Sequence, residues 1–227
     1  MNRRIRQFVA ILFLVPLAFS ATAQPARYIA GTHYIELSNP VRTQDPSKVE
    51  VVEAFWYGCT HCFRFEPLLE NWVANLPDDV NFVLFPAQWN QLMKIHSQIY
   101  YVSEALLAAG KIDKAKFSEL HEAAFNAINI DGNRLQNERQ IGALFTEHGV
   151  SEEDFSSTFN SFSVRTKVNQ GDRRMQDYQV RSTPNMIVNG KYLISTGQAV
   201  TTQQEMLNVV EFLIDRERQA MASTSGD

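Results

Sequence analysis

The 227-residue sequence predicts an α/β fold in which a helical subdomain interrupts the sheet-forming part of the chain. Strand-like apolar runs occur before residue 86 and again after residue 185, whereas the pattern from 92 to 178 is helical throughout. The only two cysteines form a CxxC motif, Cys59-Thr60-His61-Cys62, which follows a strand and precedes a helix. These observations predict one interrupted domain with a chemical site at the strand-to-helix junction.

The first 23 residues are typical of a secretory signal peptide. Three arginines precede an apolar run from Phe8 to Phe19, and Ala21-Thr22-Ala23 has the small-x-small pattern of a cleavage site. The run is too short to span a membrane comfortably, so we expect a mature chain from Gln24 in a bacterial periplasm. Cleavage would reduce the 21 basic residues to 18 against 25 acidic ones, and the resulting net charge of −7 disfavours nucleic-acid binding.

Residues 24–91 are expected to form the first part of the sheet. An extended segment lies around 34–37, and a strand is expected at 51–57. The helix after the CxxC motif carries apolar residues at helical spacing to about Leu76 and ends before a proline. A second strand is expected at 80–85. Strand, helix and parallel strand together form a right-handed crossover unit.

Residues 92–178 are expected to form the helical insertion. Apolar stripes predict helices around 99–109, 117–125 and 141–145, and Ser151 with an aspartate three residues on predicts the start of a fourth. No fixed period recurs, which disfavours a repeat array. The aromatic and methionine residues of the stripes are therefore expected to be core rather than a cofactor site.

Residues 179–220 are expected to complete the sheet and end in a helix. Asn189-Gly190 between two short apolar runs is a strong β-hairpin pattern. Thr201 and Gln204 are expected to cap the final helix. Residues 221–227 are expected to be a disordered tail.

The position of the CxxC motif indicates redox chemistry. Unpaired backbone N–H groups and the positive end of the dipole at a helix N-terminus stabilise a thiolate. Cys59 is therefore expected to have a lowered pKa and to be the attacking and attacked sulfur. Cys62 lies about one turn further along the helix, so it is expected to face the interior and act as the resolving cysteine.

Three other interpretations of the two cysteines are less favoured. A structural disulfide that closes so small a loop would contribute only about 2 kcal/mol. A zinc site would need two further ligands, and the remaining histidines show no HxxxH-type spacing. Covalent haem attachment would require a histidine directly after Cys62, where Phe63 stands.

Glu53, His61, Thr183 and Pro184 are further candidates for the site. Glu53 interrupts an apolar strand, so it either points inward and exchanges a proton with Cys62 or is a solvated strand glutamate. The His61 ring either stabilises the nearby thiolate or is an exposed spacer. A cis bond before Pro184 would let the Thr183 backbone hold an extended substrate peptide, whereas a strand-edge proline is the alternative.

Three separated features of the chain resemble the DsbA-type periplasmic disulfide oxidases. They are the run from Val52 through the CxxC motif to Glu66, the helical insertion, and Thr183-Pro184 followed by Asn189-Gly190-Lys191-Tyr192. The similarity covers about residues 34–213. It implies a thioredoxin fold with a helical insertion, a catalytic Cys59, a resolving Cys62, a buried proton-relay Glu53 and a cis Pro184.

Two positions depart from the pattern of that family. Thr60 stands where the best-known dithiol of the family has proline, and the family's lysine near the relay glutamate appears here as Leu84 or Phe85. We therefore expect the redox potential and the proton relay to differ in detail.

The sequence and the resemblance together predict a monomeric dithiol oxidase that introduces disulfide bonds into newly exported proteins. No metal or organic cofactor is expected, and the resemblance implies reoxidation by a quinone-coupled membrane partner of the DsbB type. A disulfide isomerase or reductase of the same fold is disfavoured, because only about 26 residues precede the first core strand after Gln24. The alternative from another class is a periplasmic copper or zinc carrier that uses the two thiols and a histidine.

Overall fold

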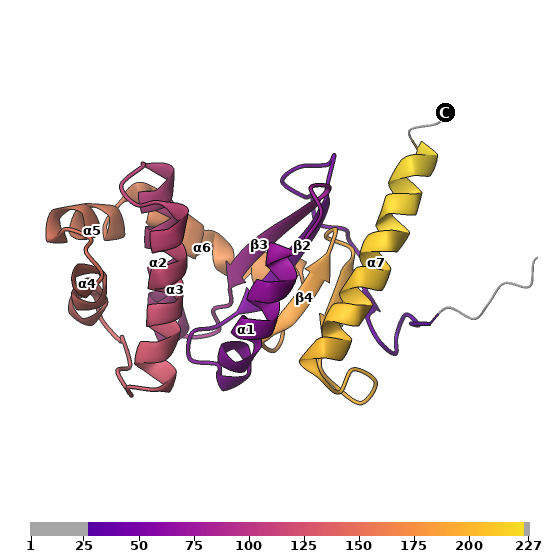
Figure 1. Ribbon diagram of the computed structural model, residues 1–227, viewed down its shortest axis with the longest axis horizontal. Helices are drawn as coiled ribbons and strands as arrows, with labels where there is room; N and C mark the ends of the chain where they lie inside the picture. The colour runs from indigo at the N-terminus through magenta and orange to yellow at the C-terminus, as the bar shows by residue number, and fades with distance from the viewer. Residues whose placement is uncertain (1–26, 225–227) are drawn as a thin grey trace, which may run out of the picture.

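The computed structural model describes residues 27–224, so the predicted signal peptide and residues 225–227 lie outside it (Figure 1). Within the described range, five strands form a mixed sheet in the order β1-β5-β4-β2-β3. Only β2 and β3 are parallel, and the other neighbouring pairs are antiparallel. The strands are β1 (Ile35–Glu36), β2 (Val49–Phe55), β3 (Val80–Pro86), β4 (Asn185–Val188) and β5 (Tyr192–Ser195).

Seven helices surround the sheet in the described range. Figure 1 shows α2 to α6 gathered at one side of the sheet, α7 at the other side and α1 between them. The helices are α1 (Thr60–Ala74), α2 (Gln91–Ala108), α3 (Lys114–Asn129), α4 (Glu138–Glu147), α5 (Glu152–Phe159), α6 (Phe162–Asp177) and α7 (Gln203–Thr224).

Strand β2 is the central element, because it pairs with β3 on one side and β4 on the other and is buried along its whole length. Its alternate residues serve two different cores. Val51 packs in the cluster that contains side chains of α1 and α7, whereas Val52 packs with Met93 of α2 and Met175 of α6. Side chains two residues apart in a strand share a face, so Glu53 lies on the face that α1 covers.

The predicted crossover unit is present in the structure. The strand expected at 80–85 is β3, which runs parallel to β2 with Glu53 opposite Leu84. Helix α1 ends at Ala74, two residues before the predicted end, because Asn75 leaves the helical backbone conformation and caps it.

The helical insertion contains five helices, one more than the four that the apolar stripes indicated. The additional helix is α6, which has few apolar residues and buries only one side of itself around Val164 and Met175. Each of the five begins at a side chain that accepts a hydrogen bond from the backbone of the first turn, including the predicted Ser151. These N-caps are Asn90, Asp113, Asn137, Ser151 and Ser161.

The C-terminal part contains the predicted hairpin and a longer helix than expected. Asn189 and Gly190 both have positive φ, as a tight turn between β4 and β5 requires. The Oγ1 atom of Thr202, rather than Thr201, accepts the capping hydrogen bond at the start of α7. The expectation of a disordered tail is wrong for residues 221–224, because α7 continues to Thr224.

Candidate active site

Cys59 lies at the N-terminus of α1, as its position in the sequence predicts. It is the N-cap residue with an extended backbone, and its Sγ atom accepts a hydrogen bond from the Cys62 amide at 3.3 Å. The cap forms because Gly58 and the end of β2 turn the chain directly into the helix. Gly58 is required here, since a Cβ at this position would lie 2.4 Å from the Trp56 ring.

These contacts lower the pKa of the Cys59 thiol to about 5. The largest cause is the hydrogen bond with the Cys62 thiol, and hydrogen bonds with Thr183 and with the amides of Cys62 and His61 act in the same direction. Partial burial opposes them. At neutral pH Cys59 is therefore a thiolate in the reduced protein, with its sulfur still partly accessible.

Cys62 has the opposite properties, although it is only three residues away. Its side chain is fully buried, and burial raises the pKa of its thiol well above the ordinary value. The neighbouring Cys59 and Glu53 charges raise this pKa further. Cys62 therefore holds its proton at neutral pH.

Glu53 is fully buried on the face of β2 beneath α1, so the alternative of a solvated strand glutamate is wrong. Neither carboxyl oxygen has a hydrogen-bond partner among the described residues. Burial, followed by the charges of Glu66 and Cys59, raises the pKa of Glu53 well above its usual range. Leu84, one of the two residues expected in place of the family's lysine, stands opposite Glu53 in β3 and offers no charge.

The Thr183–Pro184 peptide bond is cis, and it brings a distant segment against Cys59. The protonated Cys59 thiol can donate to the Thr183 carbonyl oxygen, which lies 3.4 Å from Sγ. His61 is exposed, and its carbonyl oxygen accepts a hydrogen bond from Gln203 of α7 at 2.6 Å. His61, Thr183 and Pro184 line one cavity of about 440 Å³ together with Arg64, Thr196 and residues 201–203.

Three residues near the site were not identified from the sequence. Glu66, one turn after Cys62 in α1, contacts His121 of α3, and Tyr57 contacts the same histidine. The spacing of four residues between Cys62 and Glu66 places both on one helix face; this spacing, and the place of Glu66 in the run that resembles the family, were the patterns that could have indicated the glutamate. Nothing local to residue 121 indicates its position beside β2.

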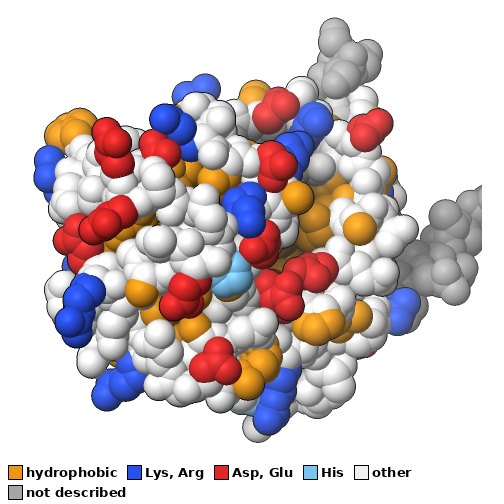
Figure 2. Space-filling view, turned by 60° about the vertical axis from the view of Figure 1, so that its left-hand side comes forward, with side chains coloured by type: hydrophobic (Ala, Val, Ile, Leu, Met, Phe, Trp, Pro, Cys, Tyr) orange, Lys and Arg blue, Asp and Glu red, His pale blue; other side chains and the backbone are white. Residues whose placement is uncertain are grey.

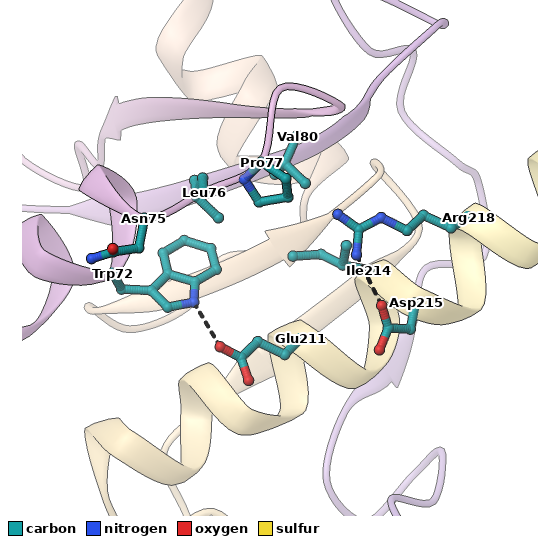
Figure 3. A pocket seen from close by; sticks show the side chains of 9 residues that line it. All are labelled: Trp72, Asn75, Leu76, Pro77, Val80, Glu211, Ile214, Asp215 and Arg218. Atoms are coloured by element: carbon teal, nitrogen blue, oxygen red, sulfur yellow. Dashed lines mark hydrogen bonds and ion pairs between the residues drawn. The ribbon is translucent and has the colours of Figure 1, made fainter.

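Another pocket, of about 270 Å³, lies between the C-terminal end of α1 and α7 (Figure 3). Its charged groups are paired with one another or with neighbouring residues: Trp72 donates to Glu211 at 3.1 Å, and Arg218 pairs with Asp215 and Asp79. Neither cysteine lines this pocket. It therefore takes no part in the dithiol site.

Two general properties of residues 27–224 concern metal binding and membrane insertion. No group of three or more His, Cys, Asp and Glu side chains in this range is arranged to hold a metal ion. None of the helices in the same range is both long and apolar enough to cross a membrane.

Comparison with known proteins identifies the family. The sequence model of the DSBA-like thioredoxin domain matches residues 50–208. The chain is 37% identical over 202 residues to the thiol:disulfide interchange protein DsbA of Pseudomonas aeruginosa, which covers 89% of this chain and 92% of that protein. Identity to the protein of the same name from Pseudomonas syringae pv. tomato is 38% over 203 residues, with 89% and 91% covered.

Solved structures agree with the sequence comparison. The crystal structure of Pseudomonas aeruginosa DsbA matches with a TM-score of 0.77 at 35% identity, over 86% of this chain and 97% of that chain. An oxidoreductase DsbA from Xylella fastidiosa matches with a TM-score of 0.74 at 27% identity. The predicted thioredoxin fold with a helical insertion is thereby confirmed. The chain belongs to the DSBA-like thioredoxin domain family, and it is a thiol:disulfide oxidoreductase.

Proposed function

We propose that this protein introduces disulfide bonds into newly exported proteins in the periplasm by exchange through Cys59 and Cys62. The opposite pKa shifts of the two thiols are the main support for this proposal. A low pKa makes Cys59 a good leaving group, so a mixed disulfide on Cys59 is readily displaced and the reduced form of the enzyme is favoured. A dithiol of this kind passes its disulfide to other proteins.

The reaction starts from the oxidised protein, in which Cys59 and Cys62 form a disulfide. A client thiolate attacks Sγ of Cys59, the bond to Cys62 breaks, and Cys62 takes a proton as it leaves. A second client thiolate then attacks the client sulfur of the mixed disulfide, and Cys59 leaves as a thiolate. The client loses two electrons and two protons, and the enzyme gains both electrons.

Glu53 is proposed to supply the proton that Cys62 takes. Burial raises the pKa of the Glu53 carboxyl well above its usual range, and the ionised carboxylate in turn raises the pKa of Cys62, so the two groups interact directly. When the dithiol is reoxidised, the proton moves back from Cys62 to Glu53. We propose that the reoxidant is a quinone-coupled membrane protein of the DsbB type, which accepts electrons from the dithiol and returns it to the disulfide.

The cavity beside Cys59 is proposed to hold an extended client segment. Thr183 and Pro184 line this cavity, and the Thr183 backbone faces the reactive sulfur. Hydrogen bonds to exposed backbone groups such as those of Thr183 bind a peptide without selecting its side chains, which suits an enzyme with many clients. The exposed His61 at the rim is proposed to stabilise the Cys59 thiolate when a client approaches.

Three further expectations remain proposals. The protein is proposed to act as a monomer after removal of residues 1–23. Residues 24–91 and 179–220 are proposed to form the thioredoxin-like parts on either side of the insertion at 92–178. Clients are proposed to be exported proteins with free thiols.

The redox potential of the Cys59–Cys62 couple is the direct test of the direction of transfer. Equilibration with glutathione should give a value above about −200 mV, whereas a value near −270 mV would identify a reductase. In parallel, the oxidised protein should introduce disulfides into a reduced, unfolded client at stoichiometric amounts. A protein that reshuffles wrong disulfides but oxidises no thiols would instead be an isomerase, and metal retained by the reduced protein through dialysis would favour a carrier.

A further inference from the structure

His121 is a buried ionisable residue that the proposed reaction does not yet use. It lies on α3 of the helical insertion, with only 7% of its surface exposed, and contacts groups from two other elements. Its Nε2 atom lies 3.4 Å from Oε2 of Glu66 on α1, and its Nδ1 atom lies 2.8 Å from the Tyr57 hydroxyl, just after β2. A histidine in this position joins the insertion to the thioredoxin-like part next to the dithiol.

The Tyr57 hydroxyl lies within hydrogen-bond distance of Nδ1 of His121 and holds the ring in place. Complete burial raises the pKa of Tyr57 well above its ordinary value, so the hydroxyl keeps its proton and can donate it to Nδ1. A neutral ring that accepts at Nδ1 carries its own proton on Nε2. Nε2 lies on the side of the ring that faces Glu66, 3.4 Å from Oε2, and no direct hydrogen bond joins the two atoms.

Several buried polar atoms of Glu53, Glu66 and His121 have no hydrogen-bond partner. Within residues 27–224, six buried side-chain oxygen and nitrogen atoms have no hydrogen-bond partner, and four of them belong to this one region: both oxygens of Glu53, Oε1 of Glu66 and Nε2 of His121. Buried polar atoms in folded proteins are almost always satisfied, by water where protein groups do not reach. A cluster of unsatisfied donors and acceptors is therefore a site for hydrogen-bonded water and for proton exchange.

Exposure rises in steps from the dithiol toward the surface between α1 and α3. Glu53 is fully buried, the Glu66 side chain is 14% exposed, and Glu70 and Glu122 are exposed. Partial burial is the largest cause of the raised pKa of Glu70; the charges of Glu66 and Glu122 raise it further and His121 lowers it, so these groups interact. On the face drawn in Figure 2, acidic side chains gather around a hollow with a hydrophobic floor, beside a histidine.

We propose that Glu66 and His121, with Tyr57 holding the ring, form a proton-transfer branch that connects Glu53 to solvent between α1 and α3. This proposal rests on the proposed function, because the branch replaces the proton that Glu53 gives to Cys62. When Glu53 has given its proton to the leaving Cys62, the branch returns one proton from solvent to Glu53. During reoxidation one proton travels outward by the same groups. No bond other than N–H and O–H bonds is made or broken in the branch.

The titratable groups that face the branch come from four elements. Glu53 and Tyr57 belong to β2 and the turn after it, the two cysteines, Glu66 and Glu70 to α1, and Glu122 to α3. Tyr100 of α2 lies near Tyr57 and raises the pKa of its hydroxyl. Leu84 or Phe85 stands where the family has a lysine. Among these groups, His121 is therefore the only basic one. A relay in this chain therefore has a histidine where a lysine is missing.

His121→Phe is the direct test, because the Phe ring fits the same aromatic surroundings. The His121 ring packs edge-on against Phe55, Tyr57 and Phe125 at centroid distances of 5.2 Å, so packing is retained while the exchangeable proton is lost. Reduction of the oxidised protein by a dithiol is followed by stopped-flow tryptophan fluorescence. The Trp56 ring lies against Gly58, next to Cys59, so its emission is expected to change on reduction. At pH 7 and low buffer concentration, we expect the variant to be slower by about three- to tenfold.

Two features separate proton transfer from a structural effect. Added imidazole, which can carry the proton, should restore most of the lost rate, and Tyr57→Phe should slow the reaction in the same buffer-dependent way but less. The matched control is His148→Phe, which removes a partly exposed histidine that pairs with Glu119 and should leave the rate unchanged. An unchanged rate in His121→Phe would overturn the proposal, and so would a slower rate that imidazole does not alter. If His121→Phe does not fold, the rate of Tyr57→Phe with and without imidazole tests the proposal by the same two criteria.

The outcome is distinguishable from failure of the proposed function. The potential and the client oxidation of the wild-type protein test that function, and they do not depend on His121. The rate of reduction by a small dithiol measures proton transfer through the branch even in a protein that oxidises no clients.

Discussion

The two ends of the first turn of α1 provide the same side chain with opposite environments. Cys59 at the N-cap is partly accessible and receives hydrogen bonds, which lower its pKa to about 5, whereas buried Cys62 has a raised pKa. Both cysteines are on one helix and share the same dipole. The difference shows that the dipole alone does not decide the charge of a thiol: local hydrogen bonds stabilise one thiolate, and desolvation prevents the other.

The comparison extends to what surrounds each thiol. Cys59 contacts the Thr183 carbonyl oxygen, and Thr183 and Pro184 line the cavity in which we propose that a client binds. Cys62 is buried and interacts electrostatically with Glu53, and we propose that only protons move on this side of the dithiol. In the proposed mechanism, the site therefore separates electron exchange with other proteins from proton exchange with solvent.

Replacing each cysteine in turn should give the largest contrast. Cys59→Ser should abolish exchange completely, because the attacked sulfur is gone. Cys62→Ala should keep the first step and accumulate mixed disulfides with clients, since no internal thiol remains to release them. Non-reducing gels of periplasmic extracts measure the trapped complexes, and a Cys62→Ala protein that traps nothing would count against the assigned roles.

Alkylation of the reduced protein across pH should separate the two thiols without any substitution. Cys59 should react with a midpoint near pH 5, whereas Cys62 should stay unreactive beyond pH 9. At pH 7 the difference in rate should reach about a hundredfold or more. Peptide mapping by mass spectrometry identifies the labelled sulfur, and preferential labelling of Cys62 would falsify the comparison.

The pH dependence of stability should also differ between the two redox forms. Only the reduced form has the Cys59 thiolate, and its folded pKa is lower than its unfolded pKa. This stabilisation is fully present above the unfolded value, near pH 9, and is lost as pH falls through about 5. After allowance for solvent screening of the partly exposed thiolate, it contributes about 1–2 kcal/mol at pH 7.

Urea unfolding of the reduced and oxidised proteins at pH 4 and pH 7 measures this effect. The free energy of unfolding of the reduced form should increase relative to the oxidised form between these values. The closed disulfide contributes about 2 kcal/mol through its short loop at both pH values, so the change with pH is more informative than the sign at one pH. A difference that does not vary with pH would contradict the lowered pKa of Cys59.

Glu53 should affect the buried thiol more than the exposed one. Glu53→Gln should slow turnover several-fold without abolishing it, because the cap still stabilises the Cys59 thiolate. The matched variant Glu53→Leu removes both unpartnered carboxyl oxygens and should raise the free energy of unfolding by about 1–3 kcal/mol. Thermal unfolding measures the gain in stability of Glu53→Leu. A Glu53→Gln protein with wild-type turnover would show that the carboxyl transfers no proton.

His61 should give the smallest effect. The His61 amide is one of the groups that lower the pKa of Cys59, and His61→Ser retains this amide. The substitution should therefore raise the pKa of Cys59 only slightly and make the protein a slightly weaker oxidant. The pH dependence of thiolate absorbance near 240 nm measures the shift. A pKa that does not move would assign the whole effect of this residue to its backbone.

The sequence by itself determined the features that depend on neighbours in the chain. The hairpin at Asn189-Gly190, the position of Cys59 at a helix start and the order of the elements other than α6 follow from local patterns. Local backbone geometry is sufficient for these features, because capping and turn formation involve residues within about four positions of one another. The role of a residue at the end of a helix can therefore be predicted before any packing is known.

The resemblance to a known family added the features that local patterns left open. On spacing alone, Glu53 was either solvated or buried, and Pro184 was either cis or a strand terminator. The observed cis bond and the complete burial of Glu53 agree with the resemblance. The helix ends were less predictable, since α7 continues four residues into the segment expected to be disordered.

Only the tertiary structure decided which distant residues meet at the dithiol. The Thr183 carbonyl reaches Cys59 across 124 residues of sequence, and Tyr57 contacts His121 across 64. These contacts result from packing β4 against β2 and the helical insertion against α1, and no periodicity within one segment encodes them. Periodic patterns specify which face of an element is buried, whereas the partner that covers that face depends on how all the elements pack together.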